Sequence, residues 1–138
     1  MIPTQLAINS VTTRNADVQA CVTAYADAGF RNVEFMLGHV KDYLTAGHRA
    51  GDLRTRLDHL ELRCIGGFEA PLACFAGADE LRTNHALHRG NASLIAELGG
   101  TVMVVGTDGP PNGVTVEDPI GHSPRSLPKS PTRSRRRA

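Results

Sequence analysis

Hydrophobic residues occur along the chain in two patterns that alternate: short continuous runs, and a spacing of three or four residues. Short, mostly apolar runs are typical of buried strands, and such runs occupy residues 6–10, 32–37, 62–66 and 101–105. Between these runs, apolar side chains return every three or four residues, as on one face of a helix. This helical spacing covers residues 15–28, 40–46, 52–60 and 79–98. The order predicts an α/β fold with parallel strands joined by right-handed crossovers.

Two of the predicted helices have a defined apolar face. Thr13 or Asn15 can cap the first helix, and Gly29 stands where a glycine would end it. The apolar face expected for this helix is Val18, Cys21, Val22 and Tyr25. The face expected for the helix at 79–98 is Leu87, Leu94, Ile95 and Leu98. Gly38 and His39 are expected to open the loop after the second strand.

The spacing of the strands limits the architecture. The predicted strands begin near residues 5, 32, 62 and 101, which leaves 27, 30 and 39 residues between starts. A (β/α)₈ barrel uses about 31 residues for each unit. The spacing fits half of such a barrel as well as it fits a small open sheet. Valines and Met103 at 101–105 are expected on both faces of a strand that is covered on both sides.

Charge divides the chain into two parts. The formal net charge of +1 is a cancellation, because residues 1–121 carry nine basic and 14 acidic side chains, net −5, whereas residues 122–138 carry six basic and no acidic ones, net +6. The second part holds three prolines, four serines and one leucine. Leu127 is its only sizeable apolar side chain, which is too little for a core, so a disordered basic tail is expected there.

Several broad classes are disfavoured by the sequence. No apolar run is long enough to cross a membrane, and the first ten residues lack the basic start of a secretory signal, so a cytoplasmic protein is expected. Cys21, Cys64 and Cys74 are too few for a disulfide framework and are predicted to be reduced thiols. No nucleotide-binding, zinc-protease or serine-hydrolase motif occurs.

Four segments together resemble one known family. They read LAINS at 6–10, AYADAGFRNVEFML at 24–37, IGGFEAPLACFAGADE at 65–80 and AELGGTVMVVGTDGP at 96–110. They resemble the N-terminal half of the xylose isomerase-like TIM-barrel proteins, the sugar phosphate isomerases and epimerases. The resemblance covers residues 5 to about 120 and implies an incomplete (β/α)₈ TIM barrel of about four βα units.

The resemblance also implies a chemistry. Members of this family use a divalent metal, Mn²⁺ or Mg²⁺, to move a proton between adjacent carbons of a sugar or polyol. The family's metal ligands come mainly from strands five to eight, which this chain does not contain. We therefore expect a truncated isomerase or epimerase whose catalysis is absent or impaired and which binds no metal on its own. Exposed sheet edges of such a half-barrel predict aggregation or a homodimer.

Five positions are candidates for substrate binding. The resemblance places Asn9, Glu34, Glu69 and Asp108 in the pocket, and His39 follows the second strand. Glu34 is the most informative, because a charge in an apolar strand must reach a polar pocket or pair with another group. For the others a structural role is also open: Asn9 as a loop cap, Asp108 as a turn residue, Glu69 as a solvated side chain and His39 as a surface loop residue.

A zinc site is a weaker interpretation. His85 and His88 lie three residues apart on a predicted helix, and Cys64 and Cys74 precede them. Structural zinc sites normally use closely spaced cysteine pairs, and this spacing lacks them.

The tail allows two further hypotheses. As a tether it would bind an acidic partner such as RNA, which makes a non-catalytic α/β module the alternative function. No aromatic residue interleaves with its charges, so specific nucleic-acid binding is not expected. Alternatively, the tail is translated out of frame, since a shifted frame in GC-rich DNA would give an alanine-rich amphipathic helix where a barrel needs its fourth helix.

Overall fold

A computed structural model describes residues 6–109 of the chain. These residues form an α/β fold with one four-stranded parallel sheet and four α-helices. The strands are β1 (Ile8–Asn9), β2 (Asn32–Met36), β3 (Arg63–Phe68) and β4 (Val102–Met103). The helices are α1 (Val18–Asp27), α2 (Leu37–Thr45), α3 (Ala50–His59) and α4 (Ala78–Glu97), with a short 3₁₀ helix at Ser10–Thr13. The predicted tail at 122–138 and the boundary near residue 121 lie outside the described residues.

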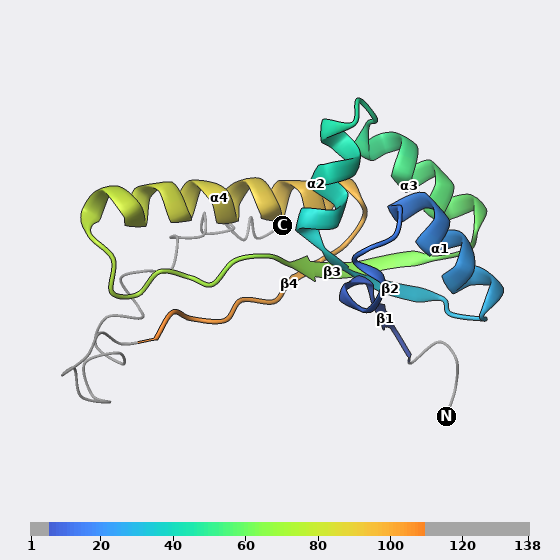
Figure 1. The fold of residues 1–138 in the computed structure, drawn as a ribbon, viewed down its shortest axis with the longest axis horizontal. Coiled ribbons are helices and arrows are strands. Elements are labelled where there is room, and N and C mark those ends of the chain that lie inside the picture. The colour runs from blue at the N-terminus through green and yellow to red at the C-terminus, as the bar shows by residue number, and fades with distance from the viewer. Residues whose placement is uncertain (1–5, 110–138) are drawn as a thin grey trace, which may run out of the picture.

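The strands follow one another across the sheet in chain order, β1-β2-β3-β4, and every neighbouring pair is parallel. Each strand therefore joins the next through a crossover that carries helical structure, and the chain advances in one direction across the sheet (Figure 1). This arrangement confirms the predicted α/β alternation. In the described residues both outer strands, β1 and β4, have a neighbour on one side only.

The core lies between the helices and one face of the sheet. Alternate residues of β2, Val33 and Phe35, are fully buried, and they belong to one apolar cluster with side chains from all four helices. The predicted apolar face of α1 is confirmed, because Val18, Cys21, Val22 and Tyr25 are its buried residues. All four helices therefore cover the same face of the sheet.

The opposite face of the sheet is not covered by the described residues. Register places Asn9, Glu34, Gly66 and Val102 in one lateral row across the four strands. Val102 is 53% exposed and Val104 is 49% exposed. The prediction that the segment at 101–105 is covered on both sides is wrong, because no layer packs on this face within residues 6–109.

The junction between β2 and α2 differs from the sequence prediction. Leu37 begins α2 directly after Met36, so Gly38 and His39 lie in the first turn of a helix rather than in a loop. The start of α1 also differs, because Asp17 caps it by accepting hydrogen bonds from the amides of Gln19 and Ala20. The end of α1 is as predicted: Gly29 has a φ of +87°, a left-handed conformation that favours glycine.

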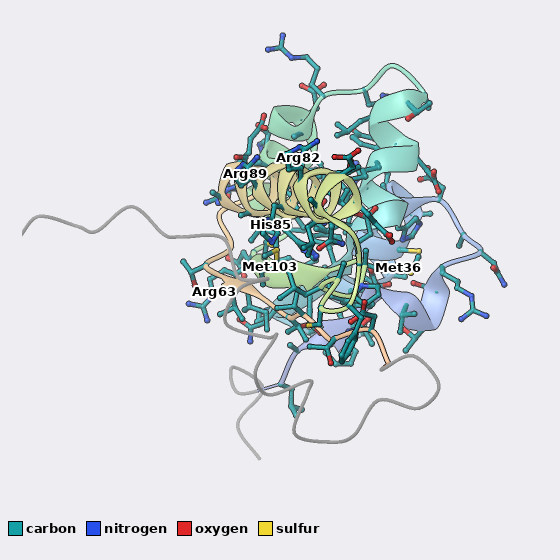
Figure 2. All side chains as sticks on the ribbon, turned by 90° about the vertical axis from the view of Figure 1, so that its left-hand side faces the viewer. Met36, Arg63, Arg82, His85, Arg89 and Met103 are labelled. Atoms are coloured by element: carbon teal, nitrogen blue, oxygen red, sulfur yellow. The ribbon has the colours of Figure 1, made fainter. Side chains whose placement is uncertain are left out.

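Helix α4 confirms the predicted apolar face in part. Ile95 and Leu98 are buried in the core as predicted, whereas Leu87 and Leu94 are only partly buried. Figure 2 shows the helix almost end-on, with His85 on the side of Met103 and with Arg82 and Arg89 on the outer side. Two polar residues that the apolar pattern did not include, His88 and Asn91, are buried as well. Among the helices of residues 6–109, none is long and apolar enough to span a membrane.

Candidate functional site

Most of the candidate residues lie in the strands of the parallel sheet or follow their carboxyl ends. Asn9 is the last residue of β1, and Glu34 lies in the middle of β2. Glu69 directly follows β3, and Asp108 lies five residues after the end of β4. Carboxyl ends of parallel strands meet at one edge of a sheet, which is where sites in such folds are built. His39 is different, because it belongs to a helix.

Asn9 and Glu34 are in direct contact. The Asn9 side-chain amide donates from Nδ2 to Oε2 of Glu34 over 2.5 Å, and the two residues are opposite each other in the β1–β2 register. The amide is oriented by a second bond, because its Oδ1 accepts from the backbone N–H of Val11 at 2.9 Å. Asn9 therefore has the capping role that the sequence offered, and the same side chain also contacts Glu34.

The second oxygen of Glu34, Oε1, has no hydrogen-bond partner among residues 6–109. Glu34 is only half-buried and lies on the uncovered face of the sheet. A carboxylate held on one side by an amide can accept hydrogen bonds or a proton at its other oxygen.

A bulge shapes the strand beside Glu34. The register between β2 and β3 shifts after Val33, so that Val33 is opposite Cys64 while Glu34 is opposite Gly66. Ile65 is the extra residue, and its side chain is 39% exposed. At Gly66 a side chain is impossible, since a Cβ would lie 2.1 Å from the carbonyl oxygen of Val102. The glycine lets the β4 backbone approach, and the β3 position opposite Glu34 therefore carries no side chain.

Glu69 forms an ion pair with Lys41. Its Oε2 lies 2.5 Å from Nζ of Lys41, and this ion pair connects α2 to the segment after β3. The Lys41 and Glu69 side chains remain 36% and 24% exposed, so water weakens the attraction and the pair contributes at most about 1 kcal/mol. The structure gives Glu69 a partner where a solvated side chain was the alternative.

Asp108 connects two loops. Its carboxylate accepts hydrogen bonds from the backbone N–H groups of Cys74 at 2.8 Å and Phe75 at 3.4 Å. Its own N–H donates to the carbonyl of Leu72 at 3.1 Å. Asp108 therefore fastens the β3–α4 loop to the segment after β4, and both carboxylate oxygens are already occupied by this structural role.

His39 is a buried helix residue, not a surface loop residue. It is 5% exposed, and its Nε2 lies 2.6 Å from the carbonyl oxygen of Ala16. Its Nδ1 is buried without a partner among the described residues. A small hollow of about 230 Å³ lies beside it, between the loop before α1 and helix α2. The ring of Tyr43 stacks on His48 in the wall of this hollow, with centroids 4.3 Å apart.

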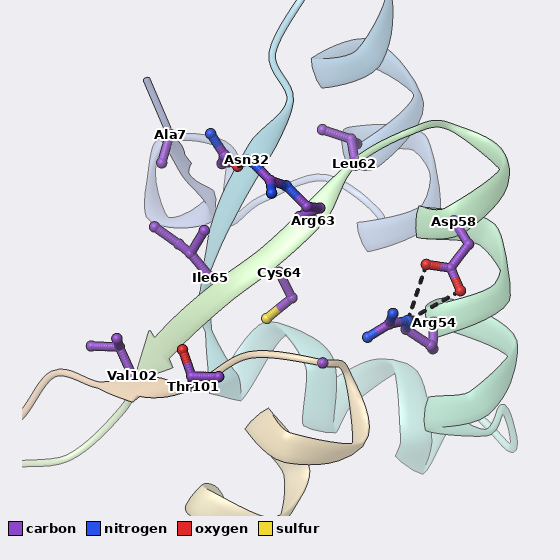
Figure 3. A pocket seen from close by; sticks show the side chains of 11 residues that line it. Ala7, Asn32, Arg54, Asp58, Leu62, Arg63, Cys64, Ile65, Thr101 and Val102 are labelled. Atoms are coloured by element: carbon purple, nitrogen blue, oxygen red, sulfur yellow. Dashed lines mark hydrogen bonds and ion pairs between the residues drawn. The ribbon is translucent and has the colours of Figure 1, made fainter. Parts of the chain in front are cut away.

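A larger hollow of about 530 Å³ lies at the amino ends of the strands (Figure 3). Arg63 donates from Nη2 to Oδ1 of Asn32 at 3.1 Å in its wall. On the helix side, Arg54 binds both carboxylate oxygens of Asp58 at 3.1 Å and the carbonyl of Leu98 at 3.0 Å. These residues were not among the predicted sites, although polar residues at the start of two apolar strands were a visible sign of them.

Cys64 lies in the same wall and is buried. Burial raises the pKa of its thiol to about 11, because the thiolate would lose its hydration, while Arg54 and backbone hydrogen bonds act weakly in the other direction. The thiol is therefore protonated and unreactive near neutral pH.

The residues do not fit the metal that the family resemblance implies. Within residues 6–109, no three His, Cys, Asp or Glu side chains come together in a way that could hold a metal ion. Glu34 has an amide partner, Glu69 a lysine and Asp108 two backbone amides. His85 and His88 likewise lack the cysteine partners that a zinc site would need. The described residues therefore offer no ligand set for the family's metal.

Comparison with known proteins gives no match: no family model, no curated protein and no solved structure corresponds to this chain. The fold and the contacts of the candidate residues are thus the basis for any functional proposal.

Proposed function

We propose that residues 6–109 form one half of a TIM-type barrel related to the sugar phosphate isomerases and epimerases, and that Asn9 and Glu34 bind a sugar or polyol on the uncovered face of the sheet. The observation that carries the proposal is the Glu34 carboxylate, which lies on that face with one oxygen held by Asn9 and the other without a partner in the described residues.

The architecture supports the proposal. A sheet in which all strands are parallel and follow chain order, with helices on one face only, is what half of a (β/α)₈ barrel requires. A doubly wound sheet would instead have helices on both faces and a reversal of strand order. Four strands are half of the eight in a complete barrel, so the uncovered face corresponds to the barrel interior.

The chemistry of the contact suits a polyhydroxy ligand. A carboxylate accepts hydrogen bonds from two adjacent hydroxyl groups, and hydrogen bonds to charged groups contribute about 1.5–3 kcal/mol each. The free oxygen of Glu34 can also accept a proton from a carbon next to a carbonyl, which is the general-base step of an isomerase. Half of a barrel provides only half of the strand ends, so we expect weak binding and little or no turnover from this chain.

The first prediction tests the role of Glu34 in binding. Sugar phosphates and polyols titrated into the labelled protein should shift the NMR signals of the Asn9 side-chain amide, Gly66 and Val102. Glu34→Gln keeps the shape but removes the charge, and we expect it to weaken binding about tenfold or more. Glu97→Gln, an exposed change on α4, is the matched control. Equal binding by both variants would show that the proposal is wrong.

A further inference from the structure

The described residues leave one side of the molecule apolar and unpaired. The large hydrophobic side chains that remain exposed are all in or beside the strands and none is on a helix: Leu6, Ile65, Val102, Val104 and Val105. Ile65, Val102 and Val104 lie on the face away from the helices, Leu6 directly precedes the edge strand β1, and Val105 follows the edge strand β4.

We propose that a second copy of this chain covers this face by closing an eight-stranded parallel barrel, in which β4 of each copy pairs with β1 of the other. This inference rests on the proposed half-barrel. It deepens the proposed function, because the second copy places its own Asn9–Glu34 pair at the same carboxyl-end opening of the barrel, where ligands of such barrels bind.

The strand directions favour a copy of the same chain over another partner. In a parallel sheet with sequential order, one edge belongs to the first strand and the other to the last. A two-fold rotation about an axis along the strands brings β1 beside β4 at both seams and keeps every strand parallel. At each of the two equivalent seams, the backbone N–H and C=O groups of β4 in one copy then bond to those of β1 in the other.

The size of the exposed area argues for pairing at the edges as well as contact between faces. Val102, Val104 and Ile65 are 53%, 49% and 39% exposed, so the apolar patch that they share is on the order of a few hundred Å². A stable dimer buries about 800 Å² from each partner. Contact between the faces alone is too small, and the remaining area has to come from the two strand edges and the helices beside them.

The sheet has one feature that favours closure. The bulge at Ile65 bends β3 and increases its twist, and bulges of this kind help a sheet to curl toward a barrel.

The second prediction follows from this closure. Light scattering after size-exclusion chromatography should give twice the 14.8 kDa mass of one chain for the full-length protein. Val102→Lys places a charge inside the proposed barrel and should give a monomer with an unchanged circular dichroism spectrum, because Val102 contributes little to the core of one copy. Ala92→Lys, an exposed change on α4, should remain dimeric. A monomeric or openly polymerising native protein would overturn the proposal.

Cross-linking separates a closed barrel from two sheets stacked face to face. Ala7→Cys and Val104→Cys, placed in different copies, should be joined by a short bismaleimide, because β1 and β4 are neighbours at each seam. Val104→Cys should not link to itself, since the two β4 strands lie on opposite sides of the barrel. Cys21, Cys64 and Cys74 are buried and should not react in the folded protein. Efficient linking of Val104→Cys to itself would contradict closure.

The sugar titration distinguishes failure of this inference from failure of the proposed function. If the native protein is a monomer and Glu34→Gln still loses sugar binding, the proposed function stands and the dimer is rejected. If the native protein is a dimer with the expected cross-link but its sugar binding does not depend on Glu34, the closed barrel stands and the proposed function is rejected.

Discussion

At the scale of single residues, Asn9 makes two contacts through one side chain. It caps the 3₁₀ helix through its oxygen, as the sequence predicted, and it holds Glu34 through its nitrogen. The pocket role of Asn9 stays a prediction. Asp108 and Glu69 were also predicted as pocket residues, but their partners come from distant parts of the chain, and no sequence pattern shows such contacts.

The third prediction concerns Cys64, whose pKa in the folded protein is raised to about 11 from an ordinary value of 9.0. The unfolded chain therefore loses this proton first as pH rises. The stability that the buried thiol contributes is fully present below pH 9 and is lost progressively up to about pH 11, by as much as about 2 kcal/mol. Urea unfolding at several pH values should measure this loss.

Cys64→Ala is the matched variant for this measurement. It costs about 1–2 kcal/mol at pH 8 through the cavity that it leaves. The difference in stability between the native protein and Cys64→Ala should shrink between pH 9 and pH 11. Comparison with this variant also removes the contribution of Tyr25, whose pKa is raised by burial. A difference independent of pH would contradict the assignment.

At the scale of elements, the alternation of strands and helices was predictable, but the inner face of α4 was predictable only in part. Periodicity counts apolar residues, and it assigned Ile95 and Leu98 to the core correctly. It did not predict the burial of His88. The reason for that burial is the loop beneath the helix, because the carbonyl of Pro71 lies within hydrogen-bonding distance of Asn84 at 3.0 Å and of His88 at 3.3 Å. A polar loop backbone needs polar partners on the helix that covers it.

The fourth prediction tests how α4 holds this loop. Asn84 donates to Pro71 and accepts from the Ala73 amide at 3.1 Å. Asn84→Ala removes both bonds, and we expect a loss of about 1–2 kcal/mol in stability. Hydrogen exchange at Ala73 and neighbouring amides should become faster. Ser93→Ala, which removes only a hydrogen bond within the same helix, is the control and should leave that exchange unchanged.

At the scale of the whole molecule, the described residues have one core, on one side of the sheet. The strand order could be anticipated from the spacing of the βα units, because sequential parallel strands need one crossover each. The bulge in β3 and the exposure of β4 could not, since both depend on which layers are present around the sheet. An apolar strand looks the same in a sequence whether it is covered on one face or on both.

The fifth prediction is that stability depends on protein concentration. If the folded state is a dimer, each tenfold dilution should lower the apparent free energy of unfolding by about 1.4 kcal/mol, because one folded particle gives two unfolded chains. The urea midpoint of the native protein should fall accordingly between high and low micromolar concentrations. Val102→Lys should have one midpoint at all concentrations. A native midpoint that does not move would count against association.

The bulge at Ile65 has one more consequence. Without the extra residue, Cys64 and Gly66 would still lie on their present faces, so strand pairing does not require it. What the extra residue provides is length: β3 follows a longer path than β2, and such a bulge bends the strand and increases its local twist. A single inserted amino acid therefore changes the shape of the sheet without changing which residues face the core.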